Sequence, residues 1–382
     1  MSNNPNPLKQ LTDYGQSFWF DNIHRAMLQN GELKKMIDED GLKGITSNPS
    51  IFEKAITSGD TYDEGLRALL AKDNTLDSRS AFFELAVEDV QNAADLLKPV
   101  YETSKGLDGY VSLEVSPDLA HDTEASIHEA RELFLKLDRP NAMIKIPATK
   151  AGIPAIEQLT SDGVNINATL LFSVERYTEV AKAYIRGLEA RQQRGLPINN
   201  INSVASFFIS RVDSKFDNLL GELSDNAEAK KLLGQTGIAN AKLAYKEGLT
   251  LFQDQSFTKL QEAGANAQRL LWASTGTKNP SFNDTLYIES LIGENTVNTI
   301  PPATAKAFKE HGKCSATLAT GLSNAEHDFS QLNSVGIDVQ SALDELEDEG
   351  VAIFEKSFLN LLQAIDDKMD SLRNAPPSES VA

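Results

Sequence analysis

A single lysine, Lys145, stands in the middle of an otherwise apolar run, residues 141–149 (NAMIKIPAT). Met143 and Ile146 favour a buried β-strand, and Pro147 would end the strand's hydrogen-bonded ladder because proline has no N–H. Burial removes hydration from an ammonium group and so favours the neutral amine. A neutral lysine amine can attack a ketone and form a Schiff base, which accepts electrons when the neighbouring C–C bond breaks. The run therefore predicts a Schiff-base lysine.

A structural role for Lys145 is the alternative. Long lysine side chains often extend from the end of a strand to water, or form an ion pair with a carboxylate in the core. The position alone does not separate these roles from catalysis. Whether Lys145 is structural or catalytic depends on which other polar residues lie at that end of the sheet.

Polar side chains also occur near the ends of the other short apolar segments. They include two carboxylates that can transfer protons, amides and hydroxyls that suit sugar oxygens, and cations that suit a phosphate. We expect one shared site that contains Asp21, Asn48, Glu114, Lys145, Asn167, Thr169, Ser206, Arg211, Ser274 and Lys278. Together these groups indicate an enzyme that acts on a sugar phosphate through a lysine.

Each of these residues also has an ordinary structural explanation. The two carboxylates could be strand-end acids or ion-pair partners of a lysine. Asn48 could simply begin a turn at Pro49. Arg211 and Lys278 could be solvated surface charges. Only their joint placement supports a shared chemical role.

Eight strands are predicted, and the ends of the first seven carry this set in turn. The sequence predicts them over residues 16–21, 41–49, 109–115, 141–149, 164–172, 202–209, 269–274 and 296–300. Helical segments separate the strands, and the clearest begins after Ser173, which can cap it. Strands that alternate with helices, with no internal repeat and no linker rich in Gly or Ser, predict one α/β domain over residues 1–382, a closed (β/α)8 TIM barrel.

Helices beyond the barrel account for the length of the chain. The usual barrel has about 250 residues, so we expect extra helices after the second strand and C-terminal helices from about residue 328. We interpret the latter as packing elements and expect residues 378–382 to be frayed. A doubly wound open sheet is the alternative, but no Gly-rich phosphate-binding fingerprint follows the first strand.

Composition narrows the range of partners. The 382 residues contain 55 acidic and 36 basic side chains, a net charge of −19, so nucleic acid is not expected as a partner. An anionic substrate would need local cations, because the overall field opposes it. The lone cysteine, Cys314, and the absence of a long apolar run predict a cytoplasmic protein that does not enter a membrane. The histidines have no metal-ligand spacing, so we expect neither a metal nor a cofactor.

Three motifs resemble signatures of the transaldolase family, transferases of the pentose phosphate pathway. They are residues 44–50 (GITSNPS), 143–149 (MIKIPAT) and 163–173 (GVNINATLLFS), and the resemblance covers nearly the whole chain. Residues 272–280 (WASTGTKNP) and 295–301 (NTVNTIP) resemble a longer-chain branch, some members of which are fused to glucose-6-phosphate isomerase. We expect no isomerase domain here, because the chain ends after the barrel and its helices.

The resemblance implies roles for the catalytic residues. Lys145 would form a Schiff base with C2 of fructose 6-phosphate or sedoheptulose 7-phosphate. Asp21 would take the proton from the C4 hydroxyl as C3–C4 breaks. Glu114, acting through a water held by Thr169, would move protons as the carbinolamine forms and collapses. The three-carbon unit would then pass to erythrose 4-phosphate or glyceraldehyde 3-phosphate.

The resemblance also implies the binding residues. Asn48 and Asn167 would hold the dihydroxyacetone unit, and Ser206 and Arg211 match phosphate positions. Many relatives have an arginine two residues after the seventh-strand serine, Ser274. Here that position is a glycine, and Lys278 follows two residues later as a point charge without the fork of an arginine. The oligomeric state is expected to be a monomer or a homodimer.

Two rival functions are open at this point. One is a lysine-dependent aldolase that releases free dihydroxyacetone. If Phe208 lines the pocket, it argues against release because it has no hydroxyl with which to protonate the enamine. The other is a barrel that binds sugar phosphates without catalysis, which would need neither Lys145 nor Glu114.

Overall fold

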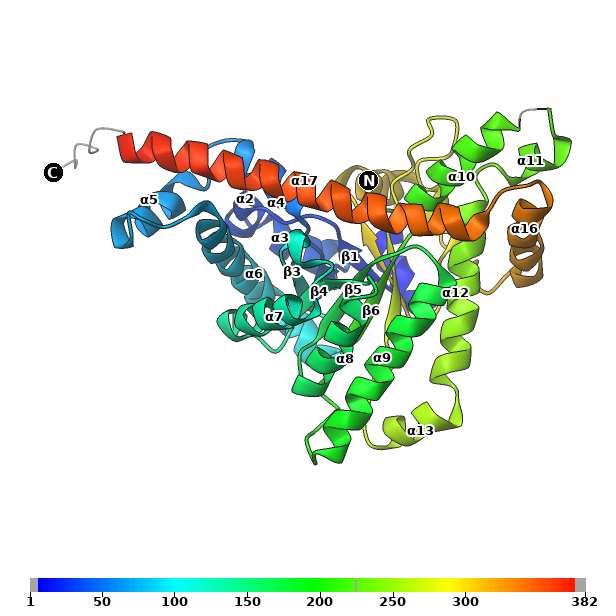
Figure 1. Cartoon of the computed structure of the whole chain (residues 1–382), viewed down its shortest axis with the longest axis horizontal. Coiled ribbons are helices and arrows are strands. Elements are labelled where there is room, and N and C mark those ends of the chain that lie inside the picture. The colour runs from blue at the N-terminus through cyan, green and yellow to red at the C-terminus, as the bar shows by residue number, and fades with distance from the viewer. Residues whose placement is uncertain (1–5, 224, 375–382) are drawn as a thin grey trace.

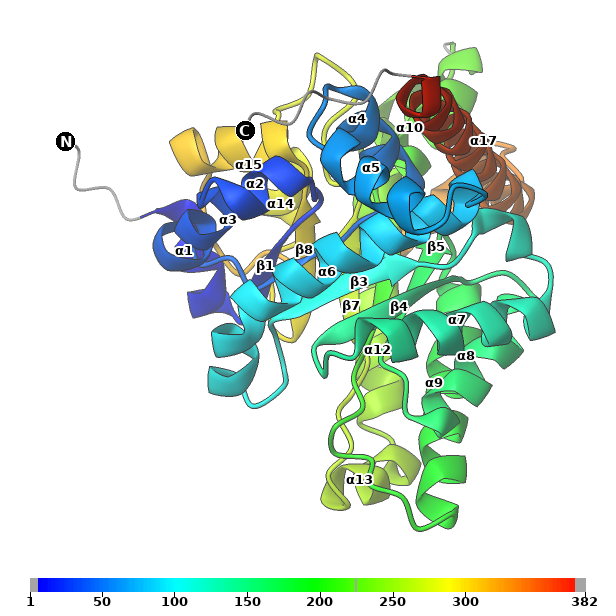
Figure 2. The same cartoon turned by 90° about the vertical axis from the view of Figure 1, so that its left-hand side faces the viewer.

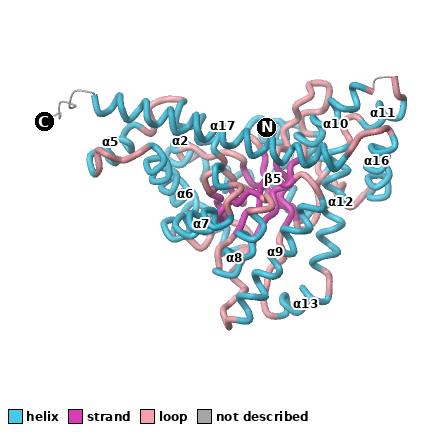
Figure 3. Tube along the Cα trace, viewed as in Figure 1, coloured by secondary structure: helices cyan, strands magenta, loops and turns pink. Residues whose placement is uncertain are grey.

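The computed structural model describes residues 6–223 and 225–374 (Figure 1). Eight parallel strands form one closed barrel in sequence order, with β8 paired to β1, which confirms the (β/α)8 prediction. Figure 3 shows the strands grouped at the centre of the molecule with helices around them. The strands are β1 Gln16–Phe20, β2 Gly44–Ile45, β3 Tyr110–Glu114, β4 Ala142–Pro147, β5 Ile166–Leu171, β6 Ser203–Phe208, β7 Arg269–Ala273 and β8 Thr296–Ile300.

Strand β2 is much shorter than the predicted segment 41–49. Its two paired residues are followed within a few positions by α4 (Pro49–Thr57), which begins at Pro49. The Asn48 side chain caps this helix, since its Oδ1 accepts a hydrogen bond from the Ile51 N–H at 3.0 Å. Asn48 therefore starts the helix three residues after the strand has ended.

Helices cover the outside of the barrel. Asp122 caps α7, and Ser173 caps α9, the latter as the sequence predicts. The remaining elements are α1 Pro7–Gln10, η1 Leu11–Tyr14, α2 Arg25–Gln29, α3 Glu32–Lys35, η2 Met36–Asp40, α5 Asp63–Lys72, α6 Ser78–Thr103, η3 Pro117–Leu119, α7 Thr123–Leu137, α8 Gly152–Asp162, α9 Val174–Gln193, α10 Ser210–Glu222, α11 Ala227–Leu232, α12 Thr236–Phe252, α13 Gln255–Glu262, α14 Leu286–Ser290, α15 Pro302–His311, α16 Leu322–Ser334 and α17 Val339–Asn374.

The C-terminal helices expected from about residue 328 are α16 and α17. Helix α16 begins earlier, and the chain breaks at Gly336, whose φ of +93° is outside the helical region. Helix α17 follows and crosses above the strands in Figure 1, with the turned view in Figure 2 showing it nearly end-on. Residues 378–382, predicted to be frayed, lie outside the described part of the chain.

Helix α17 approaches the carboxyl end of β5 closely. A Cβ atom on Gly350 would lie 3.1 Å from the Leu170 side chain and 3.3 Å from the Phe172 ring, so a glycine permits this approach. One ion pair that holds the helix joins Arg176 Nε to Glu347 Oε2 at 3.0 Å. The last helix is thus fixed over the end of the barrel at which the predicted site residues lie.

Two further features of the fold are the character of its helices and the environment of its one cysteine. Among the described residues, no helix has both the length and the apolar character needed to cross a membrane. Cys314 is a free, partly buried thiol, and its Sγ donates to the Pro7 carbonyl oxygen at 3.3 Å.

Candidate active site

A cavity of about 720 Å³ lies at the carboxyl ends of the strands. Barrel enzymes place their active sites at this end, and the volume suits a small-molecule ligand. Most of the predicted site residues line it, namely Asp21, Asn48, Lys145, Ser206, Phe208, Arg211, Ser274 and Lys278. Glu114, Asn167 and Thr169 do not line this cavity but are buried on the neighbouring strands β3 and β5. The fold therefore brings the predicted set together from strands that are far apart in the sequence.

Lys145 lies in the cavity on β4 and is only 4% exposed. The strand register places it beside Glu114 of β3 and Asn167 of β5. Its Nζ donates to the Ser47 carbonyl oxygen at 3.2 Å and is 3.4 Å from Glu114 Oε2. A core carboxylate, Glu114, is therefore present beside Lys145, as a purely structural role of this lysine would require. The catalytic interpretation assigns proton transfer to the same carboxylate.

Glu114 is buried beside this lysine. Loss of hydration raises the pKa of its carboxyl to about 7, the Lys145 charge acts in the opposite direction, and the negative charge of Asp21 adds to the rise. Neither carboxylate oxygen accepts a hydrogen bond within residues 6–223 and 225–374. A carboxyl with this pKa can take up or release a proton near neutral pH, which is the property that a general acid and base needs.

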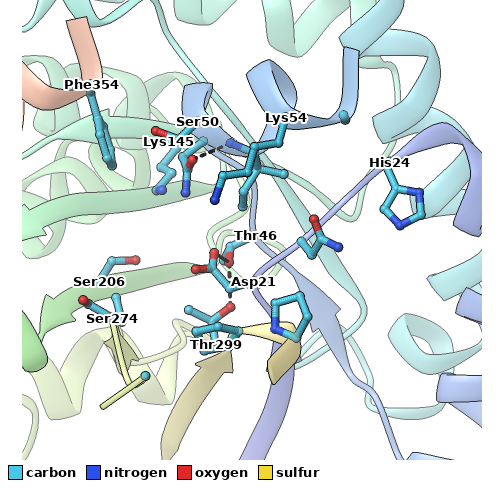
Figure 4. A pocket seen from close by; sticks show the side chains of 18 of the residues that line it. Asp21, His24, Thr46, Ser50, Lys54, Lys145, Ser206, Ser274, Thr299 and Phe354 are labelled. Carbon is cyan, nitrogen blue, oxygen red and sulfur yellow. Dashed lines mark hydrogen bonds between the residues drawn. The ribbon is translucent and has the colours of Figure 1, made fainter. Parts of the chain in front are cut away.

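Asp21 follows β1 and faces the cavity, close to Thr46 and Thr299 (Figure 4). Its Oδ1 accepts a hydrogen bond from Thr46 Oγ1 at 2.7 Å, and Thr46 Oγ1 is 2.6 Å from Thr299 Oγ1. Lost hydration raises the pKa of Asp21, while the Lys145 charge and the Thr46 hydrogen bond lower it. The carboxylate is thus oriented by a hydroxyl and lies in the same electrostatic environment as the lysine.

A hydrogen-bonded row of polar side chains connects β3, β5 and β6. Asn167 donates from Nδ2 to Ser112 Oγ at 3.0 Å and accepts from Ser206 Oγ at 2.6 Å. Asn167 is fully buried, whereas Ser206 lines the cavity. The amide therefore sets the direction of a hydroxyl that a substrate can contact.

Two non-glycine residues near the site have backbone conformations that L-residues rarely adopt. Leu170 follows Thr169 with φ of +61°, where the β5 to β6 register also shifts, and Ser274 follows β7 with φ of +56°. The Ser274 Oγ is 2.8 Å from Ser210 Oγ. Such strain persists when surrounding contacts enforce it, and it is concentrated at functional sites. The Oγ1 of Thr169 is buried and has no hydrogen-bond partner in the described part of the chain.

Besides Lys145 and the ion-paired Arg25, three further cations line the same cavity: Lys54, Arg211 and Lys278. None of them lies within 4 Å of a carboxylate oxygen of the described residues. The Arg211 guanidinium carbon is 5.2 Å from the Phe208 ring centroid and 5.6 Å from that of Phe354. In a chain with net charge −19, unpaired cations gathered at one cavity supply the local attraction that a phosphate needs.

Sequence reasoning missed Lys54 and Phe354. Lys54 is on α4, one helical turn after Ser50, and Ser50 is two residues after Asn48. The i, i+4 spacing between Ser50 and Lys54 was therefore a usable signal. Phe354 is on α17, which we predicted to be a packing element only. Its ring centroid is 5.7 Å from Lys145 Nζ, and Figure 4 shows it above that lysine. No local pattern connects two residues so far apart in the chain.

A metal site is not found among the described residues, where no three His, Cys, Asp or Glu side chains are grouped to hold an ion. The lysine, the two carboxylates and the hydroxyls are instead arranged for proton transfer around an amine. This arrangement can form and break a Schiff base on a ketone.

The comparisons with known proteins agree with this geometry. The family model described as Transaldolase/Fructose-6-phosphate aldolase matches residues 18–365. A protein named Transaldolase 2 from Nostoc punctiforme is 46% identical over 377 residues, covering 96% of this chain and 98% of that protein. Transaldolase 1 from Streptomyces coelicolor is 46% identical over 365 residues, or 95% of each chain. Transaldolase from Mycolicibacterium smegmatis is 44% identical over 374 residues, covering 98% of this chain and 100% of that one.

Proposed function

This chain belongs to the transaldolase/fructose-6-phosphate aldolase family, and we propose that it acts as a transaldolase. It transfers a dihydroxyacetone unit from sedoheptulose 7-phosphate or fructose 6-phosphate to glyceraldehyde 3-phosphate or erythrose 4-phosphate, in the non-oxidative pentose phosphate pathway. The relatives that share its full length carry this name. The observation that carries the proposal is the buried Lys145 amine, 3.4 Å from a carboxylate whose pKa is about 7.

The first step in this proposal is Schiff-base formation. Glu114, the nearest carboxylate, accepts a proton from Lys145, and the neutral amine attacks the C2 carbonyl to give a carbinolamine. Glu114 then returns the proton as the carbinolamine loses water. The buried hydroxyl of Thr169 is available to hold a water between the carboxylate and the reacting carbon.

The second step is cleavage and transfer. Asp21 takes the proton of the C4 hydroxyl, the C3–C4 bond breaks, and its electron pair moves to the Schiff-base nitrogen. The aldose phosphate leaves and a three-carbon enamine stays on Lys145. The enamine carbon attacks the acceptor aldehyde, Asp21 returns its proton, and hydrolysis of the new Schiff base releases the product.

The binding roles follow the cavity wall. Asn48 at the wall holds the dihydroxyacetone unit, and Asn167 behind the wall acts on it through the Ser206 hydroxyl. Arg211, Ser274 and Lys278 hold the phosphate. Lys54, which the sequence reasoning missed, adds a further cation to this cavity, in a chain that has Gly276 at the position where many relatives have an arginine.

Phe208 favours transfer over release of dihydroxyacetone. Its side chain lines the cavity and is 6% exposed. A phenyl ring has no proton to give to the enamine, so the intermediate persists until an acceptor arrives. We also propose that the chain works as one domain, as a monomer or homodimer, in the cytoplasm. Its single cysteine fits such a reducing compartment.

Borohydride trapping tests this proposal. With fructose 6-phosphate and no acceptor, reduction should leave a three-carbon adduct on Lys145, located by peptide mass spectrometry. Asp21→Asn should leave a six-carbon adduct instead, because the Schiff base forms but C3–C4 does not break. Lys145→Ala should leave none.

Two outcomes would overturn it. Stoichiometric release of free dihydroxyacetone on every turnover, without erythrose 4-phosphate, would indicate an aldolase. Absence of an adduct on any lysine, with fructose 6-phosphate still bound, would indicate a binding protein without catalysis.

A further inference from the structure

The guanidinium of Arg211 is held in an unusual way for a largely buried charge. It lies over the faces of two aromatic rings, 5.2 Å from the Phe208 centroid and 5.6 Å from the Phe354 centroid. No carboxylate of residues 6–223 or 225–374 is in ion-pair contact with it, and its buried Nη1 has no hydrogen-bond partner there. Buried arginines are normally paired with acids.

Aromatic contacts have a consequence that an ion pair does not. A carboxylate partner would occupy the N–H groups of the guanidinium and compete with any bound anion. Ring faces fix the plane of the guanidinium through cation–π attraction and leave its N–H donors free for the two-pronged contact that phosphate prefers.

The second ring comes from an element outside the barrel. Phe354 is on α17 and is 4% exposed. The helix is tied to the rim of the barrel near this point, because Ser50 Oγ donates to Ser357 Oγ at 2.7 Å and Lys215 Nζ is 2.8 Å from Glu349 Oε1. The position of the ring over Arg211 is therefore set by the docking of the C-terminal helix.

We propose that Phe354 is a positioning residue that holds the Arg211 guanidinium against Phe208 so that its N–H groups meet the phosphate of the substrate. The identity of the ligand as a sugar phosphate rests on the proposed function. The contact between the rings and the arginine does not.

The test uses the binding of inorganic phosphate to the full chain by calorimetry, at fixed ionic strength and without turnover. Phe354→Leu keeps an apolar side chain of similar size but removes the ring face. We expect phosphate binding about tenfold weaker, from the usual strength of a desolvated cation–π contact. The KM for fructose 6-phosphate should rise by a similar factor, with a smaller change in kcat.

The matched control is Phe358→Leu, one helical turn further along α17. An arginine also lies over the Phe358 ring, since the guanidinium carbon of Arg79 is 5.3 Å from the ring centroid. This pair is not among the residues that line the cavity. The control loses the same kind of contact and similar packing, so its phosphate affinity should match that of the unaltered protein. An equal loss in both variants would mean that Phe354 only packs the helix.

A double-mutant cycle isolates the pair. In an Arg211→Lys background, which has lost the planar fork, Phe354→Leu should weaken phosphate binding little further. Independent, additive losses would overturn the proposal. Because binding of inorganic phosphate does not involve the Schiff base, failure of Lys145 trapping and failure of this cycle are separate results.

Discussion

At the scale of single residues, the chemistry depends on a lysine and a glutamate that are buried together. Lys145 is 4% exposed and Glu114 is 5% exposed, and their charged atoms are 3.4 Å apart. Water cannot exchange protons freely with groups in such a position, so the carboxylate becomes the nearest proton acceptor for the amine. The pair therefore links the structural explanation of a core lysine to its catalytic one.

The pH dependence of activity should report Glu114. The ionised form is the one that can accept the Lys145 proton, and it forms as pH rises through about 7, so kcat/KM should rise over that range. Glu114→Gln should lose this inflection and lower kcat by roughly 10²- to 10⁴-fold. The control is Glu129→Gln, which removes another largely buried carboxylate, bound to Ser116 at 2.8 Å, from outside the cavity. A wild-type inflection that survives in Glu114→Gln would show that another group titrates.

The two exposed cavity lysines should act on substrate binding. Lys54→Ala and Lys278→Ala should each raise the KM for fructose 6-phosphate about three- to tenfold with little change in kcat, since each loses a charge-assisted contact at a solvated site. Added salt should reduce the difference from the unaltered protein. Lys182, an exposed lysine of α9 that does not line the cavity, provides the control for a lost surface charge. Unchanged KM in both variants would show that these lysines do not bind the phosphate.

At the scale of elements, the C-terminal helix is part of the site. Helix α17 packs against α4, α5, α6 and α10 and brings Phe354 over Lys145 and Arg211. Its close approach to the barrel depends on Gly350, which faces Leu170. The helix therefore has a fixed distance from the strand that carries Asn167 and Thr169.

Enlarging Gly350 should move the helix. Gly350→Val adds a branched side chain where even a Cβ would be 3.1 Å from Leu170, and we expect a loss of roughly 1 to 3 kcal/mol in the free energy of unfolding. The KM for fructose 6-phosphate should rise as well, because Phe354 shifts with the helix. Gly221→Val, at a position of α10 with open space around it, is the control and should cost little. Loss of stability without any change in KM would show that the position of α17 does not affect substrate binding. Urea unfolding and steady-state kinetics on the same samples measure both effects.

At the scale of the whole molecule, a buried ionic network holds the helices that border the cavity. Arg25 Nε is 2.8 Å from Asp89 Oδ1, and Tyr62 donates to Asp89 Oδ2 at 2.8 Å. These residues connect α2, α5 and α6, and both Arg25 and Tyr62 line the cavity. Asp89 is fully buried, so the network satisfies a charge that has no access to water.

Breaking this network should cost stability. Asp89→Ala leaves the buried Arg25 charge without its main partner, and we expect a loss of roughly 3 to 5 kcal/mol in urea unfolding. Glu88→Ala removes the second partner of the same arginine. Because the Glu88 side chain is 57% exposed, this change should cost about 1 kcal/mol or less. Equal losses would mean that burial does not distinguish the two ion pairs.

Much of this architecture could be predicted from the sequence. Apolar segments that end in polar residues identified all eight strands, and alternation with helices identified the closed barrel. The predicted residues Asp21, Lys145, Ser206 and Arg211 all line one cavity, because strands of a parallel barrel end at the same face. These features depend on local composition and on chain order, which are both present in the sequence.

Only the tertiary structure decided the rest. It shortened β2 to two residues, buried Asn167 behind Ser206, and set Lys145 within ion-pair distance of Glu114. It also brought Phe354 to the site, although the sequence favoured packing alone for that helix. Distances across a cavity and contacts between distant segments depend on how whole elements dock. No local pattern of residues specifies that docking, because it results from packing over the entire barrel.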